Sequence, residues 1–328
     1  MRRVLLIGQG PTAESALASL LARFEVAGLV RRDPGAVAAF ARERGVPVLQ
    51  DTSVAAVQAA VGELRPDCVV VSSYDRILPA SLLERCPFVN VHYAPLPRYR
   101  GRAAVNWAII DRRPETAITV HVLVPELDAG RILFQQRVPI GPHDTVGDLY
   151  ARLNDLQRAR LASVVERHLD GDQGWPQDES AATYGCTRLP ADGEIDWTRP
   201  TNEVYAVVRA LGDPYPGAFT HLDGRRLVLW RAAPAPSPRR WVGRVPGRVV
   251  GRSATGGWVD VLTGDGVLRL DLVERDGEAR RPAAAVIRSV RTTLGLRPAE
   301  LLARVRELQD ALARARPYDE ASEGSEVT

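Results

Sequence analysis

Short apolar strands alternate with helices through the first part of the chain. Residues 4–7 form an all-apolar run that leads through a glycine turn into an Ala- and Leu-rich helix, a change of period that marks a strand–helix unit. We predict further strands at 25–30, 67–72 and 88–92, and further helices at 34–44, 54–62 and 79–85. Because strands joined by crossover helices pair in parallel, the sequence predicts an α/β domain with a doubly wound, Rossmann-like parallel sheet.

Gly8 and Gly10 stand where a dinucleotide-binding loop would stand, between the first strand and its helix. The third glycine of that fingerprint is missing, and Arg31 and Arg32 follow the second strand where an acidic residue would bind a ribose. We therefore interpret this loop as a tight turn.

The pattern changes from residue 217 onward to short strands bounded by turns. These strands are expected at 218–221, 227–230, 247–251, 258–262 and 267–273. Such regular spacing is typical of a small barrel or sandwich, and we predict an OB-like β-barrel. The predicted domains are a catalytic domain at 1–188, a linker at 189–216, the barrel at 217–297, and a terminal helix with a disordered acidic tail at 298–328.

Charge and cysteine content narrow the classes of function. The chain has 43 basic and 40 acidic residues, which gives no electrostatic case for a nucleic-acid specialist. Cys68, Cys86 and Cys186 lie far apart without CxxC spacing, so neither a metal site nor a disulfide framework is indicated. The first apolar run is too short for a membrane span. We expect a cytoplasmic protein without a membrane partner, whose oligomeric state the sequence leaves open.

An amide, an imidazole and a carboxylate occur together in the segment 89–130. Asn90 and His92 end a predicted strand and project to the same face, and Asp128 lies in a Leu-Asp-Ala-Gly turn. Such a set can donate to an oxyanion, move a proton and balance charge, as acyl transfer to an amine requires. Taken singly, a strand-end histidine is more often structural, and Asp-x-Gly is often only a turn.

The order of motifs in this segment favours a catalytic role over a structural role for these three residues. The motifs are Asn90-Val91-His92, Leu96-Pro97, Tyr99-Arg100-Gly101, Trp107-Ala108, Thr116 and Thr119 with His121, and Asp128-Ala129-Gly130. In this order they resemble the 10-formyltetrahydrofolate-dependent formyltransferases. Residues 195–197, 208–210 and 213–219 are similar to the linker and barrel entry of the two-domain members, namely methionyl-tRNA formyltransferases and the formyltransferase domain of the bifunctional aminoarabinose-pathway enzyme.

The resemblance implies roles for individual residues. Asn90 would bind the formyl oxygen, His92 would transfer protons, and Asp128 would hold His92 and accept charge from the attacking ammonium, with 10-formyltetrahydrofolate as co-substrate. It also implies pterin contacts, partly through backbone, which we assign to Tyr74, Ile77, Leu78 and Asp144. For His121 we favour a structural role, since a lone strand histidine is usually structural.

Two departures from the family pattern concern the acceptor. Members that act on initiator tRNA carry a basic insertion after the second strand, whereas this chain has only Arg31 and Arg32 there. A tRNA must be held through its phosphates, so the missing insertion counts against a nucleic-acid partner. Tyr93 also stands where the tRNA enzymes have a small residue, and it either shapes the acceptor pocket or only packs.

These departures favour a small-molecule amine as acceptor, either an amino sugar nucleotide or an amine on a peptide or siderophore-type intermediate. Besides Tyr93, we assign acceptor contacts to Arg98, Arg100 and Arg102, although loop arginines are often simply solvated. The alternatives are a methionyl-tRNA formyltransferase and a non-catalytic folate-binding protein. The intact polar set at Asn90, His92 and Asp128 argues against the last.

Overall fold

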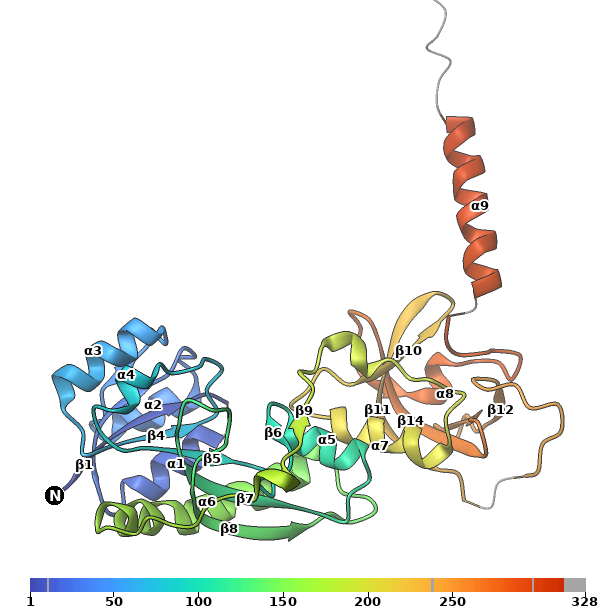
Figure 1. Ribbon diagram of the computed structural model, residues 1–328. Coiled ribbons are helices and arrows are strands. Elements are labelled where there is room, and N and C mark those ends of the chain that lie inside the picture. The colour runs from blue at the N-terminus through green and yellow to red at the C-terminus, as the bar shows by residue number, and fades with distance from the viewer. Residues whose placement is uncertain (11, 237–238, 297, 316–328) are drawn as a thin grey trace, which may run out of the picture. The chain divides into compact units, whose positions relative to one another are not determined.

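The computed structural model describes residues 1–10, 12–236, 239–296 and 298–315 (Figure 1). These residues form two compact units, one made of Met1–Gly193 with Tyr205–Gly217, the other of Glu194–Val204 with the described residues from Ala218 on. The chain therefore passes between the units three times. The domain boundaries given above stay a prediction, but the predicted linker contains helix α7 (Thr201–Leu211), which both units share.

The first unit is built on a seven-stranded sheet with the order β3-β2-β1-β4-β5-β7-β8. Its strands are β1 (Arg3–Gly8), β2 (Glu25–Val30), β3 (Val48–Leu49), β4 (Cys68–Ser72), β5 (Phe88–His92), β7 (Glu115–Val122) and β8 (Ile132–Pro139). Strands β1 to β5 are parallel, as predicted, while β7 is antiparallel to both neighbours. The sheet is thus mixed, because β7 runs opposite to β5, and the β7–β8 hairpin then returns β8 to the direction of β1 to β5.

Helices cover both faces of this sheet. They are α1 (Thr12–Leu20), α2 (Ala36–Glu43), α3 (Val54–Leu64), α4 (Ala80–Leu83), α5 (Ala104–Ile110) and α6 (Val146–Leu169). Leu5 and Ile7 of β1 pack in a core that also holds residues of α3 and α4, and α1 packs against α6 (Figure 1). Strand β4 is buried throughout, which explains why the central strands read as continuous apolar runs. Thr145 and Asp148 start α6 with a capping box.

The strand order reverses between β1 and β4, where the loops leaving the two strands diverge. A crevice at such a point is the usual ligand position in open α/β sheets. A Cβ on Gly8 would lie 2.7 Å from the Cβ of Ala13, so the turn needs glycine there. Arg31, buried at the end of β2, donates to the carbonyl of Gly10 at 3.1 Å. These contacts agree with a tight turn at Gly8–Gly10.

The second unit contains an antiparallel sheet with the order β10-β11-β14-β13-β12, and β15 pairs with β14. The strands are β10 (Ala218–Leu222), β11 (Arg225–Pro234), β12 (Val249–Arg252), β13 (Val259–Leu262), β14 (Val267–Arg275) and β15 (Arg281–Pro282). All five predicted strands are present. The pairing does not join β10 to β12, so a closed OB-like barrel stays a prediction.

Short elements complete the chain. They are β6 (Arg100–Gly101), β9 (Tyr184–Gly185), two 3-10 turns (Glu179–Ala181 and Pro190–Gly193), α8 (Ala283–Val286) and α9 (Pro298–Ala315). Helix α9 agrees with the predicted terminal helix, whereas the predicted acidic tail lies outside the described residues. Among the described helices, none has the length and hydropathy that a transmembrane span requires.

Candidate active site

Strand β5 positions Asn90 and His92 on one face, since alternate residues of a strand point the same way. In the sheet register, Asn90 lies beside Val71 of β4 and His121 of β7. His92 is only 9% exposed. Both side chains therefore sit at the carboxyl end of a buried strand, as predicted.

Asp128 lies in the connection between β7 and β8 and adopts a left-handed conformation with φ of 48°. Its carboxylate accepts the Gly101 N–H at 2.7 Å, and its carbonyl accepts from the Gln177 side chain at 2.7 Å. A Cβ on Gly130 would lie 1.8 Å from the carbonyl oxygen of Val122, so the turn requires glycine at position 130. The turn holds the carboxylate in one place.

The structure brings the three predicted catalytic residues together with His121. The Asn90 carboxamide nitrogen lies 3.1 Å from Nε2 of His121 and 3.4 Å from Oδ1 of Asp128. Nδ1 of His92 lies 3.8 Å from Oδ2 of Asp128. An amide donor, an imidazole and a carboxylate thus converge from separate segments.

Backbone carbonyls determine the tautomers of both histidines, because a carbonyl oxygen can only accept. Nε2 of His92 lies 2.8 Å from the carbonyl oxygen of Tyr99, so it carries hydrogen. Nδ1 of His121 lies 3.0 Å from the carbonyl oxygen of Val122, so it carries hydrogen and Nε2 accepts from Asn90. The nitrogen of His92 that can take up a proton is therefore Nδ1, on the Asp128 side.

Burial and charge set opposite protonation states for His92 and Asp128. Burial lowers the pKa of His92, and this outweighs the raising effects of Asp128 and the Tyr99 carbonyl. Burial alone would raise the pKa of Asp128, but His92, His121 and the Gly101 N–H hold that pKa well below its ordinary range. At neutral pH the site therefore holds a neutral imidazole beside a carboxylate, which suits general base catalysis.

His121 is completely buried and orients the Asn90 carboxamide. Its Nε2 also lies 3.5 Å from Oδ1 of Asp128. We expected a structural role for this residue from its sequence position alone, and the structure places it inside the cluster. The antiparallel pairing of β5 with β7, which puts Asn90 opposite His121, would have indicated this contact.

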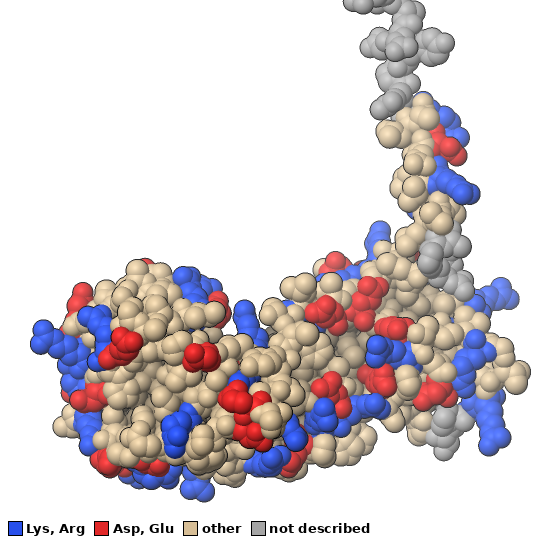
Figure 2. All heavy atoms as spheres, in the orientation of Figure 1, with Lys and Arg blue, Asp and Glu red and all other residues tan. Residues whose placement is uncertain are grey.

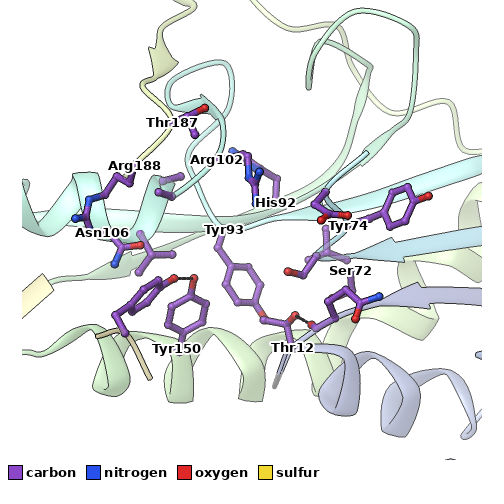
Figure 3. A pocket seen from close by; sticks show the side chains of 18 of the residues that line it. Thr12, Ser72, Tyr74, His92, Tyr93, Arg102, Asn106, Tyr150, Thr187 and Arg188 are labelled. Atoms are coloured by element: carbon purple, nitrogen blue, oxygen red, sulfur yellow. Dashed lines mark hydrogen bonds between the residues drawn. The ribbon is translucent and has the colours of Figure 1, made fainter. Parts of the chain in front are cut away.

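A cavity of about 600 Å³ opens beside His92 (Figure 3). Of the predicted site residues, His92, Tyr93, Tyr74 and Arg102 line it. Sequence reasoning missed several other lining residues, namely Gln9, Thr12, Asn106, Tyr150, Arg188 and Tyr215. They come from segments that no single motif joins, although Gln9 lies in the glycine turn and Asn106 adjoins the Trp-Ala motif.

The predicted folate contacts are not all on this cavity. Tyr74 lines it and donates to the Thr52 carbonyl at 2.9 Å. Ile77 is 80% exposed, whereas Leu78 is buried in the apolar core, so only the backbone of Leu78 could meet a ligand. The Asp144 carboxylate pairs with Arg152 and accepts the Gly141 N–H. The last three residues are not among those lining the cavity.

Tyr93 both lines the cavity and packs. Its hydroxyl donates to Asn154 at 2.8 Å and lies 3.0 Å from the side-chain oxygen of Gln157. Its ring lies 5.9 Å from that of Tyr150. The burial that accompanies these contacts raises the pKa of Tyr93, so the hydroxyl stays protonated. Tyr93 therefore packs inside the fold, and its predicted contact with the acceptor stays a prediction.

The three predicted acceptor arginines have different surroundings. Arg102 is exposed and lines the cavity, and Arg98 borders a separate depression beside Trp107. Arg100 is only 1% exposed, with its guanidinium bonded to Glu179 at 2.6 Å and Gln177 at 2.9 Å. The bond to Glu179 raises the pKa of Arg100. The structure thus contradicts an acceptor contact for Arg100, because its donors are already used inside the fold.

Two family models match the chain. Residues 25–165 match the formyl transferase family, and residues 189–291 match the formyl transferase C-terminal domain. A methionyl-tRNA formyltransferase from Symbiobacterium thermophilum is 34% identical over 314 residues, which cover 90% of this chain and 95% of that protein.

Solved structures share the fold. HypX from Aquifex aeolicus matches with a TM-score of 0.66 and 20% identity over 88% of this chain, which spans 49% of the length of HypX. An N-formyltransferase from Helicobacter canadensis, solved with folinic acid and dTDP-3-aminofucose, matches with a TM-score of 0.63 and 16% identity over 82% of this chain and 98% of that one. The predicted family and the predicted class of enzyme are confirmed. The chain belongs to the formyl transferase family and carries both its transferase domain and its C-terminal domain.

Proposed function

We propose that this chain transfers the formyl group of 10-formyltetrahydrofolate to a primary amine at the cluster of Asn90, His92 and Asp128. The observation that carries the proposal is the position of His92, whose Nδ1 lies 3.8 Å from Oδ2 of Asp128 and whose side chain lines a cavity. Family membership supports the same reaction. A non-catalytic folate-binding protein would not need this arrangement.

In the proposed mechanism the amine attacks the formyl carbon, and a tetrahedral intermediate forms. The Asn90 carboxamide, whose bond to Asp128 is long at 3.4 Å, donates to the oxygen as negative charge develops. Nδ1 of His92 takes the proton that the amine loses and returns it to the departing folate nitrogen. Asp128 stabilises the protonated imidazole between these steps.

The residues present fit the co-substrate's formyl group, since the cluster supplies one amide donor and one base. For the pterin, Tyr74 and the exposed Ile77 remain the proposed contacts, with Leu78 acting through its backbone. Asp144, whose carboxylate is held by Arg152 and Gly141, would act by shaping its loop. The cytoplasmic location expected from the sequence remains part of the proposal.

The first candidate acceptor is charged initiator tRNA. A curated relative that covers 90% of this chain bears the name methionyl-tRNA formyltransferase. This finding favours the alternative stated above over the small-molecule acceptor that we expected, and it weakens our expectation that no nucleic acid binds.

A small-molecule amine is the second candidate, and the short connection between β2 and α2 favours it. This connection runs only from Arg31 to Gly35, which leaves no room for a basic insertion that could hold tRNA phosphates. The face of the molecule in Figure 2 carries acidic and basic side chains side by side, without a continuous basic field. The cavity of about 600 Å³ is of a size typical of small-ligand sites.

A formyl-transfer assay with both acceptors tests the proposal. Purified protein and 10-formyltetrahydrofolate with a labelled formyl group would be incubated with charged initiator tRNA and with a panel of amino sugar nucleotides and amines. A tRNA enzyme should lose affinity steeply as salt increases, and a small-molecule enzyme should respond weakly. Label transfer to one class identifies the acceptor, and no transfer to any amine contradicts the proposed function.

A further inference from the structure

Two buried polar atoms without hydrogen-bond partners lie at one end of the cavity. Within the described residues, Oδ1 of Asn106 and Nε of Arg188 are both buried and have no partner. Both residues line the cavity, and Figure 3 shows Arg188 reaching toward Asn106 at the end away from Tyr74. Buried polar atoms are nearly always bonded in folded proteins, so this pair indicates a ligand.

The orientation of Asn106 is determined by its other bond. Helix α5 holds the side chain at 0% exposure, and Nδ2 donates to the carbonyl of Ala210 at 2.7 Å. Because a carbonyl can only accept, the amide cannot be flipped without losing this bond. Its oxygen therefore presents lone pairs that only a donor can use.

Arg188 lies in the segment between β9 and the 3-10 turn Pro190–Gly193, and its side chain is half-buried. No ion pair involves Arg188 among the described residues, although Asp192 and Tyr215 act on its charge through space. The Asp192 carboxylate instead accepts the Leu189 N–H at 2.6 Å. The guanidinium thus remains available to an anion in the cavity.

We propose that Arg188 and Asn106 form the subsite that binds a phosphate ester and its neighbouring hydroxyl on the acceptor. The planar guanidinium suits phosphate oxygens, and a sugar hydroxyl supplies the donor that Oδ1 of Asn106 lacks. An apolar amine would leave both atoms unpaired, which costs affinity. That the bound ligand is the acceptor of the reaction rests on the proposed function. Binding of a phosphate ester to the subsite can be tested without the reaction.

Binding of ribose 5-phosphate and of ribose to the full chain, measured by isothermal calorimetry without formyl donor, tests the subsite. We expect ribose 5-phosphate to bind the wild type more tightly than ribose does, and Arg188→Gln to weaken its binding about tenfold to a hundredfold, the loss expected for a charge-assisted hydrogen bond. The affinity of Arg188→Lys for ribose 5-phosphate should lie between those of the wild type and Arg188→Gln. Arg160→Gln, an exposed change on α6, is the matched control and should bind like the wild type.

Equal binding of ribose 5-phosphate to the wild type and to Arg188→Gln would overturn the subsite, as would equal binding of ribose and ribose 5-phosphate to the wild type. Thermal melts of each variant check folding. Kinetics distinguish the source of the phosphate. Arg188→Gln should raise KM at nearly constant kcat for the acceptor whose phosphate binds the subsite, which is either charged initiator tRNA or a dTDP-linked amino sugar. If neither is formylated, the proposed acceptors fail while the calorimetric result still decides the subsite.

Discussion

Nε2 of His92 lies 2.8 Å from the carbonyl oxygen of Tyr99, and this contact assigns the proton of the imidazole to Nε2. Only Nδ1 can then act as a base, and it lies on the side of Asp128. The loop that carries Tyr99 therefore helps to determine which nitrogen reacts.

Asn90→Ala and His92→Ala should each lower kcat by about a hundredfold to a thousandfold, the range for losing an oxyanion donor or a general base. Steady-state kinetics with saturating donor measure the effect, and circular dichroism shows whether the fold is kept. Turnover close to the wild-type value in either variant would remove that residue from the mechanism.

The pH profile of the wild type should report the lowered pKa of His92. Because burial lowers that pKa below its ordinary value of 6.5, the imidazole stays neutral at pH 7, and kcat/KM should fall only as pH drops through a value under about 6.5. The profile should be measured across the acid range with folding monitored. A fall that begins well above neutrality contradicts a depressed pKa.

Asp128→Asn should reduce kcat by at least about tenfold, because the carboxylate stabilises protonated His92. It should also move the acid limb of kcat/KM to lower pH, since Asp128 raises the pKa of His92. The second effect distinguishes an electrostatic role from damage to the turn. Full activity from about pH 6 to pH 8 would mean that Asp128 only forms the turn.

His121→Phe should lower kcat about tenfold with little change in the donor KM, because His121 acts by orienting the carboxamide of Asn90. A double-mutant cycle provides the test. If His121 works through Asn90, the change should have little further effect on kcat when Asn90 is already alanine. Additive losses in kcat would show that the two side chains act separately.

Arg100→Met should lower the melting temperature by about 2–4 °C for each 1 kcal/mol of stability lost, since it removes a buried group bonded to Glu179 and Gln177. The acceptor KM should stay unchanged. Arg98→Met, at an exposed position in the same loop, is the control and should melt like the wild type. A raised KM at unchanged melting temperature would restore the acceptor role that the structure argues against.

Sequence patterns predicted the helices and strands because the formation of these elements depends largely on residues that are close together in the chain. The predicted strands 25–30 and 88–92 agree with β2 and β5, since apolar runs and strand periodicity depend on neighbouring residues. Asn90, His92 and Asp128 could also be named from motifs, because strand alternation and the glycine requirement of the Asp128 turn act over a few residues. No short sequence pattern indicated that β7 runs antiparallel to its neighbours.

Tertiary packing decided which polar side chains are available to a ligand. Arg98, Arg100 and Arg102 look alike in sequence, yet only Arg100 meets partners 77 and 79 residues further along the chain and is buried by them. Asn106 and Arg188 line the same cavity because tertiary packing brings their distant segments together. The sequence by itself determined the chemistry carried on β5 and its adjoining turn, and the fold determined what surrounds it, because contacts between distant segments depend on how the whole chain packs.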